Sequence, residues 1–326
     1  MINAVTLGID IGGTNTVFGF VDGNGNCIAE SSIPTNSREP AEKLFGRLNL
    51  KIDELYSTIC MTHKLIGIGI GAPNANYFKG TVELPPNLKW GVVNVLEIVK
   101  NYYDLPSAIT NDANAAAIGE MQFGAAKGMK DFIVITLGTG LGSGIVVNGQ
   151  LVYGSDGFAG ELGHTIYNPD GRICGCGRKG CLEAYVSASG IKRTAFELLS
   201  RSNEESEMRK ISFDELTSKM ICEAALRGDK VALEAFDFTG KVLGIKLADA
   251  VAHTSPEAII LFGGLALAGD LIFTPTKKYM EEFMLDIFKN KVKLLPSALP
   301  GGNAAVLGAS ALIWNELKTN LKTKEV

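Results

Sequence analysis

Short apolar runs, separated by turns rich in glycine and asparagine, open the chain and predict β-strands. Two of the first three runs flank the stretch 22–26, Asp-Gly-Asn-Gly-Asn, which is typical of a hairpin turn. We therefore expect an antiparallel meander, followed by the alternating helices and strands of an α/β domain. The predicted strands are residues 6–11, 16–21, 27–32, 65–71 and 108–110. The predicted helices, from apolar positions at helical spacing, are residues 40–61, 93–103 and 113–123.

A second unit with the same order of elements begins at residue 131. An apolar strand leads into a glycine loop with a threonine, then a strand, an Asn-Gly turn and another strand, as at the start of the chain. This similarity predicts two related lobes that face one another. The predicted strands of this part are residues 131–137, 145–147, 151–153 and 258–262. The predicted helices are residues 191–200, 213–227, 230–253 and about 303–317.

Length and composition are those of a two-domain globular protein. The chain has 326 residues, 46% of them hydrophobic and 20% charged, and its net charge of -4 predicts no nucleic-acid partner. The long uncharged stretch 132–155 is broken by glycines, so we expect no transmembrane segment, and the first residues lack the pattern of a signal peptide. We expect a cytoplasmic protein. The smaller lobe is predicted to comprise residues 1–115 and 302–326, and the larger lobe residues 116–301.

The first motif is GIDIGGTN, residues 8–15, where a predicted strand ends at two glycines and a threonine. Glycines let backbone N–H groups approach phosphate oxygens closely, and the hydroxyl of Thr14 adds a donor. Asp10 is suited to hold a magnesium ion, directly or through water. A hairpin turn without a ligand explains the motif almost equally well when it is taken alone.

The second motif is LGTGLGSG, residues 137–144. It lacks the lysine of the GxxxxGK[ST] loop, and the following strand excludes the dinucleotide-binding fingerprint. Four glycines in eight residues weaken a strand pair without a packing benefit, which favours phosphate binding. A third turn, Gly263-Gly264, follows strand 258–262 and could support a flat base, although tight strand-to-helix packing is an equal alternative.

The motif TNDANAAAIGE, residues 110–120, places Asn111 and Asp112 between a strand and a helix. A helix N-cap is the favoured interpretation of this motif alone. The alternative is that Asp112 acts as a base toward a substrate hydroxyl, with Asn111 on an adjacent hydroxyl.

A cluster of thiols gives the most specific signal. Cys174, Cys176 and Cys181 lie within eight residues, and His164 precedes them by ten. Three thiols and one imidazole are the ligand set of a closed tetrahedral zinc site, so we expect a structural zinc ion in a reducing compartment. Two flanking carboxylates, Glu161 and Glu183, suit sugar hydroxyls. A glycosidase acid pair is disfavoured because a glycosidase needs no phosphate loops, and surface ion pairs are the alternative for each glutamate.

Taken together, these motifs resemble the ROK family of sugar kinases and repressors, within the actin-like, hexokinase-type ATPase superfamily. The resemblance runs from Asp10 to the C-terminal helix and is most specific in G-H-x9-C-x-C-G-x-x-G-C-x-E, residues 163–183. It implies an α/β, two-lobed actin-like (ribonuclease H-like) ATPase fold with the active site in the interlobe cleft. The bacterial glucokinases of this family are the members that the chain resembles in character.

The resemblance also implies roles for particular residues in a transfer from ATP, with Mg²⁺ and structural Zn²⁺, to the 6-hydroxyl of a hexose, glucose first. Asp112 would be the general base, and His164 would share its ring nitrogens between zinc and sugar. Nucleotide contacts are implied for Asp10 through Mg²⁺ and for Gly12, Gly13, Thr14, Thr139, Gly140, Gly263 and Gly264. Sugar contacts are implied for Asn87, Asn111, Asp112, Glu161, His164 and Glu183.

Two alternatives stay open at this point. A kinase for N-acetylmannosamine, N-acetylglucosamine, allose or fructose differs only in the walls of its pocket, which the sequence does not show. A sugar-sensing repressor of the same family is disfavoured because only nine residues precede Asp10. Asn74 stands where relatives usually carry glycine after a G-x-P segment, so the sugar-side loop is expected to differ slightly. The family further implies a homodimer.

Overall fold

The computed structural model describes residues 2–300 and 304–324 and contains two compact units. The first unit comprises Met1–Gly128, Leu151–Ala159 and Ala298–Val326, and the second comprises Met129–Gln150 and Gly160–Ser297. The chain therefore leaves the first unit twice and returns to it twice. No helix in the described part of the chain combines the length and apolar character that crossing a bilayer requires.

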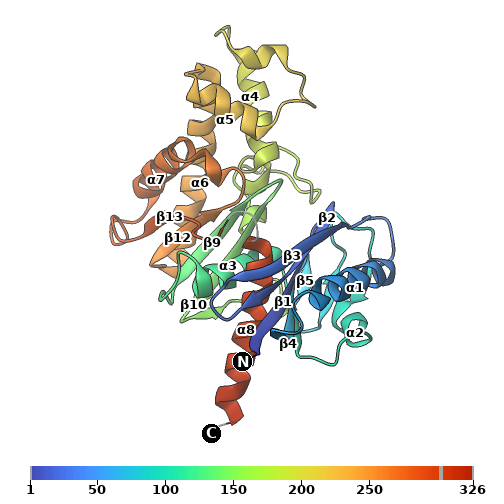
Figure 1. The fold of residues 1–326 in the computed structure, drawn as a ribbon. Coiled ribbons are helices and arrows are strands. Elements are labelled where there is room, and N and C mark those ends of the chain that lie inside the picture. Colours follow the sequence, from blue (N-terminus) through green and yellow to red (C-terminus); the bar gives the residue numbers. More distant parts are fainter. Residues whose placement is uncertain (1, 301–303, 325–326) are drawn as a thin grey trace. The chain divides into compact units, whose positions relative to one another are not determined.

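The first unit is built on a five-stranded mixed sheet with the order β3-β2-β1-β4-β8 (Figure 1). β1, β2 and β3 are antiparallel neighbours, which confirms the predicted meander, while β4 and β8 continue the sheet in parallel with β1. The parallel strands bring their carboxyl ends to one edge, where ligands bind in α/β proteins. The strands are β1 (Asn3–Ile11), β2 (Asn15–Asp22), β3 (Cys27–Pro34), β4 (His63–Gly71) and β8 (Ser107–Thr110).

Helices cover this sheet, and the last helix of the chain is one of them. Where α8 crosses β1 and β4, its backbone comes so close that only glycine fits on the strands. A Cβ atom on Gly69 would lie 1.8 Å from the carbonyl oxygen of Ala309, and one on Gly8 would lie 2.2 Å from that of Val306. The helices are α1 (Ala41–Ser57), α2 (Val95–Lys100), α3 (Asp112–Phe123) and α8 (Ala304–Lys324). The predicted start of α8, Asn303, lies outside the described residues.

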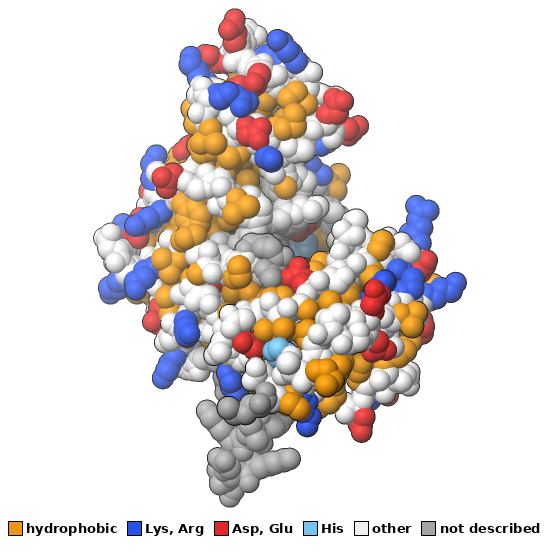
Figure 2. Space-filling model, viewed as in Figure 1, with side chains coloured by type: hydrophobic (Ala, Val, Ile, Leu, Met, Phe, Trp, Pro, Cys, Tyr) orange, Lys and Arg blue, Asp and Glu red, His pale blue; other side chains and the backbone are white. Residues whose placement is uncertain are grey.

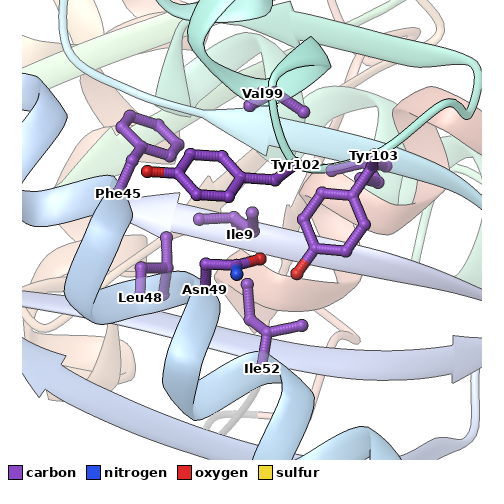
Figure 3. A pocket seen from close by; sticks show the side chains of 9 residues that line it. Ile9, Phe45, Leu48, Asn49, Ile52, Val99, Tyr102 and Tyr103 are labelled. Atoms are coloured by element: carbon purple, nitrogen blue, oxygen red, sulfur yellow. The ribbon is translucent and has the colours of Figure 1, made fainter.

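A small antiparallel sheet, which the sequence did not predict, adds to the first unit. Its strands are β5 (Ala75–Asn76), β6 (Thr81–Glu83) and β7 (Val92–Asn94). The apolar core between α1, α2 and the main sheet contains a cavity of about 10 Å³, lined among others by Phe45, Asn49 and Tyr103 (Figure 3). Because this volume suits about one water molecule, the cavity is a packing gap and no substrate pocket.

The second unit repeats the strand order of the first in its own five-stranded sheet, β11-β10-β9-β12-β13. β9 is antiparallel to β10 and parallel to β12, as β1 is to β2 and β4, so the predicted duplication is present in the topology. Two strand predictions were wrong in extent. β10 begins at Leu141 because the second half of the glycine motif joins the ladder, and β11 ends at Leu151 because the chain then passes to the first unit. The strands are β9 (Phe132–Leu137), β10 (Leu141–Val147), β11 (Gln150–Leu151), β12 (Ala258–Phe262) and β13 (Lys293–Pro296).

The second unit has four α-helices, and α6 packs against each of the other three. α7 was not predicted, since Pro275 inside it removes a helical hydrogen bond and argues against a helix. α7 packs closely on α6 at Gly240 and Gly244, because a Cβ on either glycine would lie within 2.7 Å of α7 atoms. The helices are α4 (Ala188–Arg201), α5 (Ser218–Leu226), α6 (Lys230–Thr254) and α7 (Asp270–Phe283). On the face shown in Figure 2, acidic and basic side chains are interspersed.

Candidate functional site

The first glycine motif forms the tight connection between β1 and β2. The backbone N–H of Gly12 donates to the carbonyl of Asn15 (3.0 Å), and the hydroxyl of Thr35 donates to the carbonyl of Gly12 (2.7 Å). A Cβ on Gly13 would lie 2.8 Å from the Cβ of Asn87, so the loop that carries Asn87 rests on this turn. The structure thus brings the predicted phosphate turn and one predicted sugar ligand together, with Thr14 and Asn87 both exposed. Sequence reasoning missed Thr35, because a contact across 23 residues leaves no local pattern.

Asp10 and Asp112 lie at the carboxyl ends of two parallel strands, β1 and β8, that flank β4. In the ladder Asp10 is opposite Gly71, and Gly71 is opposite Thr110, two residues before Asp112. Burial raises the pKa of Asp10 to about 7, and the charge of Asp112 adds to this shift. Crowding by protein atoms also raises the pKa of Asp112, while the N–H of Ala113 lowers it, yet the side chain is open to water. Two carboxylates that repel one another form a site that a cation stabilises.

At the junction between β8 and α3, the helix cap and the candidate base are two different residues. Asn111 is the N-cap of α3, and its Oδ1 accepts from the N–H of Asn114 at 3.0 Å. Asp112 is the first helical residue, and one carboxylate oxygen accepts from the N–H of Ala113 at 2.8 Å. The helix N-terminus therefore stabilises the ionised form of Asp112, and its second oxygen is available to a substrate proton.

Asn74, which stands where relatives usually carry glycine, adopts a backbone conformation that glycine favours. Its φ of 51° lies in the left-handed region, which asparagine tolerates better than most residues. Its Nδ2 donates to the carbonyls of Glu83 and Leu84, each at 3.1 Å, and these bonds fix the turn. The departure from the usual pattern therefore keeps a glycine-like backbone here.

The second and third glycine turns meet in the second unit. In the loop between β9 and β10, the N–H of Gly138 donates to the carbonyl of Gly140 at 3.0 Å, and Thr139 is exposed. The turn after β12 joins this loop, since the N–H of Leu265 donates to the carbonyl of Leu137 at 3.1 Å. Gly263 has a φ of 99°, and a Cβ there would lie 2.7 Å from the Leu137 carbonyl oxygen. Gly264 follows it and is exposed.

The four predicted metal ligands converge. The ligand atoms of His164, Cys174, Cys176 and Cys181 all lie within 4.8 Å of one another. The Sγ atoms of Cys176 and Cys181 are 3.6 Å apart, and the Sγ of Cys174 is 3.8 Å from the Nδ1 of His164. Tetrahedral zinc, with bonds of about 2.3 Å to sulfur and about 2.0 Å to nitrogen, spaces its ligand atoms roughly 3.5–3.8 Å apart. The cluster fits a zinc ion with His164 bound through Nδ1.

Each of the two candidate sugar carboxylates lies beside a different ligand of this cluster. Glu161 is exposed, and its Oε2 is 4.0 Å from the Nε2 of His164, the ring nitrogen that faces away from the thiols. Glu183 is half-buried, and its Oε2 accepts from the N–H of Leu141 at 2.9 Å. Its other oxygen lies 3.4 Å from the Sγ of Cys174. Sequence reasoning did not anticipate that Glu183 would reach the second glycine loop.

Within each unit, then, the structure groups the predicted residues. The first unit brings together Asp10, Gly12, Gly13, Asn87, Asn111 and Asp112. The second unit brings together Gly140, Gly263, Glu161, Glu183 and the four zinc ligands.

Comparison with known proteins identifies relatives over nearly the whole chain. The family model described as the ROK family matches residues 6–316. The glucokinase of Halalkalibacterium halodurans is 34% identical over an alignment of 328 positions, which covers 98% of each chain. The xylose repressor of Caldicellulosiruptor bescii is 32% identical over 315 residues, covering 95% of this chain and 78% of the repressor.

A solved structure agrees with these matches. It is a ROK family glucokinase from Streptomyces griseus in complex with glucose and AMPPNP, 34% identical, with a TM-score of 0.79. The similarity covers 94% of this chain and 98% of that one. The fold described above is thus the actin-like fold of such enzymes.

Proposed function

Because this chain belongs to the ROK family, we propose that it is a kinase that transfers the terminal phosphoryl group of ATP to the 6-hydroxyl of a hexose, with glucose as preferred acceptor. The observation that carries the proposal is the exposed carboxylate of Asp112 beside Asp10, at the sheet edge next to the Gly12-Gly13 turn. The glucose and AMPPNP bound by the Streptomyces griseus glucokinase support both substrate classes.

Phosphoryl transfer depends on alignment and charge neutralisation, so the chain needs few reactive groups. In our proposal Asp112 accepts the proton of the sugar hydroxyl as that oxygen attacks the terminal phosphorus in line. Asp10 would assist the magnesium ion that neutralises the phosphates. Burial and the charge of Asp112 raise the pKa of Asp10. Backbone N–H groups at Gly12, Gly13, Thr14, Thr139 and Gly140 hold the phosphates, and the Gly263-Gly264 turn lies near the adenosine.

The sugar is held, in the same proposal, by side chains of both described groups. Asn87, Asn111, Glu161, His164 and Glu183 bind hydroxyls. The three cysteines and Nδ1 of His164 would hold the zinc ion, which would stiffen the segment and fix the tautomer of His164. The Nε2 of His164, which lies 4.0 Å from Oε2 of Glu161, would then bind a sugar hydroxyl and orient it.

A coupled assay over a panel of hexoses tests the proposal most directly. ATP, ADP and polyphosphate serve as donors, and glucose, allose, fructose, N-acetylmannosamine and N-acetylglucosamine serve as acceptors. We expect ATP with glucose to give the highest kcat/KM. A higher kcat/KM for another acceptor would make that sugar the preferred substrate and would leave the kinase assignment unchanged. If ATP is consumed with none of these monosaccharides, the kinase assignment is refuted. A protein that binds a sugar and also binds DNA sequence-specifically in a gel-shift assay would instead be a transcriptional regulator.

A further inference from the structure

The segment that follows the zinc ligands also holds the second glycine loop. Three hydrogen bonds run from residues 183–189 to residues 138–141. Oε2 of Glu183 accepts from the N–H of Leu141 (2.9 Å), and the N–H of Ala188 donates to the carbonyl of Gly138 (2.9 Å). The hydroxyl of Ser189 donates to the backbone carbonyl of Thr139 (3.2 Å). We call residues 183–189 the loop brace. It begins two residues after the zinc ligand Cys181.

Glu183 contributes more to this contact than one hydrogen bond. The nearest atoms that a Cβ on Gly140 would meet all belong to Glu183, with Oε2 at 2.3 Å, Cδ at 3.1 Å and Cγ at 3.8 Å. The φ of Gly140 is not positive, so its backbone alone would accept alanine. An alanine at this position would therefore have to displace the carboxylate of Glu183, which lies directly over the loop.

The brace is itself firmly anchored. Ser187 is fully buried, its hydroxyl donates to the carbonyl of Glu183 (2.8 Å), and it accepts from the N–H of Gly190 as the N-cap of α4. On the other side, Leu182 donates through its N–H to the carbonyl of Thr165, next to the zinc ligand His164. A displacement of the zinc segment would consequently move Glu183 relative to the glycine loop.

We infer that Glu183 is a positioning residue for the nucleotide: it sets the conformation of the Gly138–Leu141 loop and links the zinc segment to the affinity for ATP. The inference rests on the proposed function, which uses this loop for phosphate binding, and adds a second role to the sugar contact expected of Glu183. A carboxylate accepts up to about four hydrogen bonds, so one oxygen can hold Leu141 while the other receives a sugar hydroxyl.

The test measures nucleotide binding without sugar, by titration calorimetry with AMPPNP and Mg²⁺ on the zinc-loaded protein. Glu183→Ala is expected to weaken AMPPNP binding about tenfold, the effect of losing one hydrogen bond to a charged group. Glu183→Gln keeps an acceptor oxygen for Leu141 and is expected to remain within about threefold of wild type. Glu205→Gln is the matched control, since Glu205 is exposed in the second unit, outside the zinc segment and the glycine loops, and should leave AMPPNP affinity unchanged.

A double-mutant cycle distinguishes a specific contact between Glu183 and Gly140 from a general loss of loop structure. Gly140→Ala should weaken AMPPNP binding in the wild-type background, where the new methyl group meets Glu183, and should cost little more in Glu183→Ala. Equal costs in both backgrounds would overturn the inference. So would wild-type AMPPNP affinity in Glu183→Ala with intact zinc content, which would leave Glu183 as a sugar ligand only. A wild-type protein that binds no AMPPNP at all would instead overturn the proposed function, and the inference with it.

Discussion

Replacement of Asp112 by asparagine separates proton transfer from structure. Asn111 caps α3, and the Oδ1 of Asp112 accepts from the N–H of Ala113, a bond that asparagine can keep. In asparagine an NH2 group replaces the second oxygen, and this group cannot accept the proton of the sugar hydroxyl. We therefore expect the melting temperature and the KM for sugar to stay close to wild type.

The size of the expected loss follows from the role of a general base. Such a group contributes about 10²–10⁴ in rate, so kcat of Asp112→Asn should fall at least about 100-fold, or roughly 3 kcal/mol in barrier. Because the base must be ionised, wild-type kcat/KM should rise with pH through the pKa of Asp112, which the surrounding protein atoms raise. The variant should lose this acidic limb of the profile.

Steady-state kinetics from pH 5 to pH 9, with ATP saturating, provide the measurement. Asp214→Asn, at an exposed position of the second unit, is the control and should match wild type. Turnover within about threefold of wild type in Asp112→Asn would refute the base assignment. A raised KM with unchanged kcat would show instead that Asp112 only binds the sugar.

Three further predictions concern the metal, the charge at the sheet edge and the helix contact. Cys181→Ser should lose its zinc by metal analysis and melt at a lower temperature, whereas Cys60→Ser, outside the cluster, should keep one zinc per chain; equal zinc in both would contradict the site. The pKa of Asp10 is raised from 3.8 to about 7, so folding favours its protonated form, and without Mg²⁺ stability should fall as pH rises from about 4 to about 7. Thermal melts of Asp10→Asn should lack this part of the slope, and an unchanged slope would exclude Asp10 as its source. Gly69→Ala should destabilise by at least about 2 kcal/mol in urea unfolding because its Cβ would overlap α8, while Gly91→Ala, with open space around it, should stay within about 0.5 kcal/mol; similar values for the two would refute the close packing.

Local patterns explain what the sequence could predict. The meander, the helix 230–253 and the strand 258–262 follow from periodicity and turn residues, and the structure has them as β1 to β3, α6 and β12. The zinc ligands were predictable because three of the four lie within eight residues, and the structure brings all four together.

Contacts between distant residues explain what could not be predicted. α7 depends on two glycines of α6 that accommodate Pro275, so its own sequence argued against it. The bond from Leu141 to Glu183 spans 42 residues, and neither residue carries a local sign of it. Sequence patterns therefore indicated which residues could bind ligands, and tertiary packing brings the side chain of Glu183 to the second glycine loop.

The position of α8 in the first unit has a consequence for synthesis on the ribosome. β1 and β4 are made early, but the helix that packs on Gly8 and Gly69 emerges only after the whole second unit. At about 5–20 residues per second, the interval from Gly128 to Ala298 lasts roughly 10–30 s. During this time the nascent N-terminal sheet lacks the helix that covers the face of Gly8 and Gly69. A chaperone that shields apolar surface would find its binding site on this face, and the second unit has the opportunity to fold first.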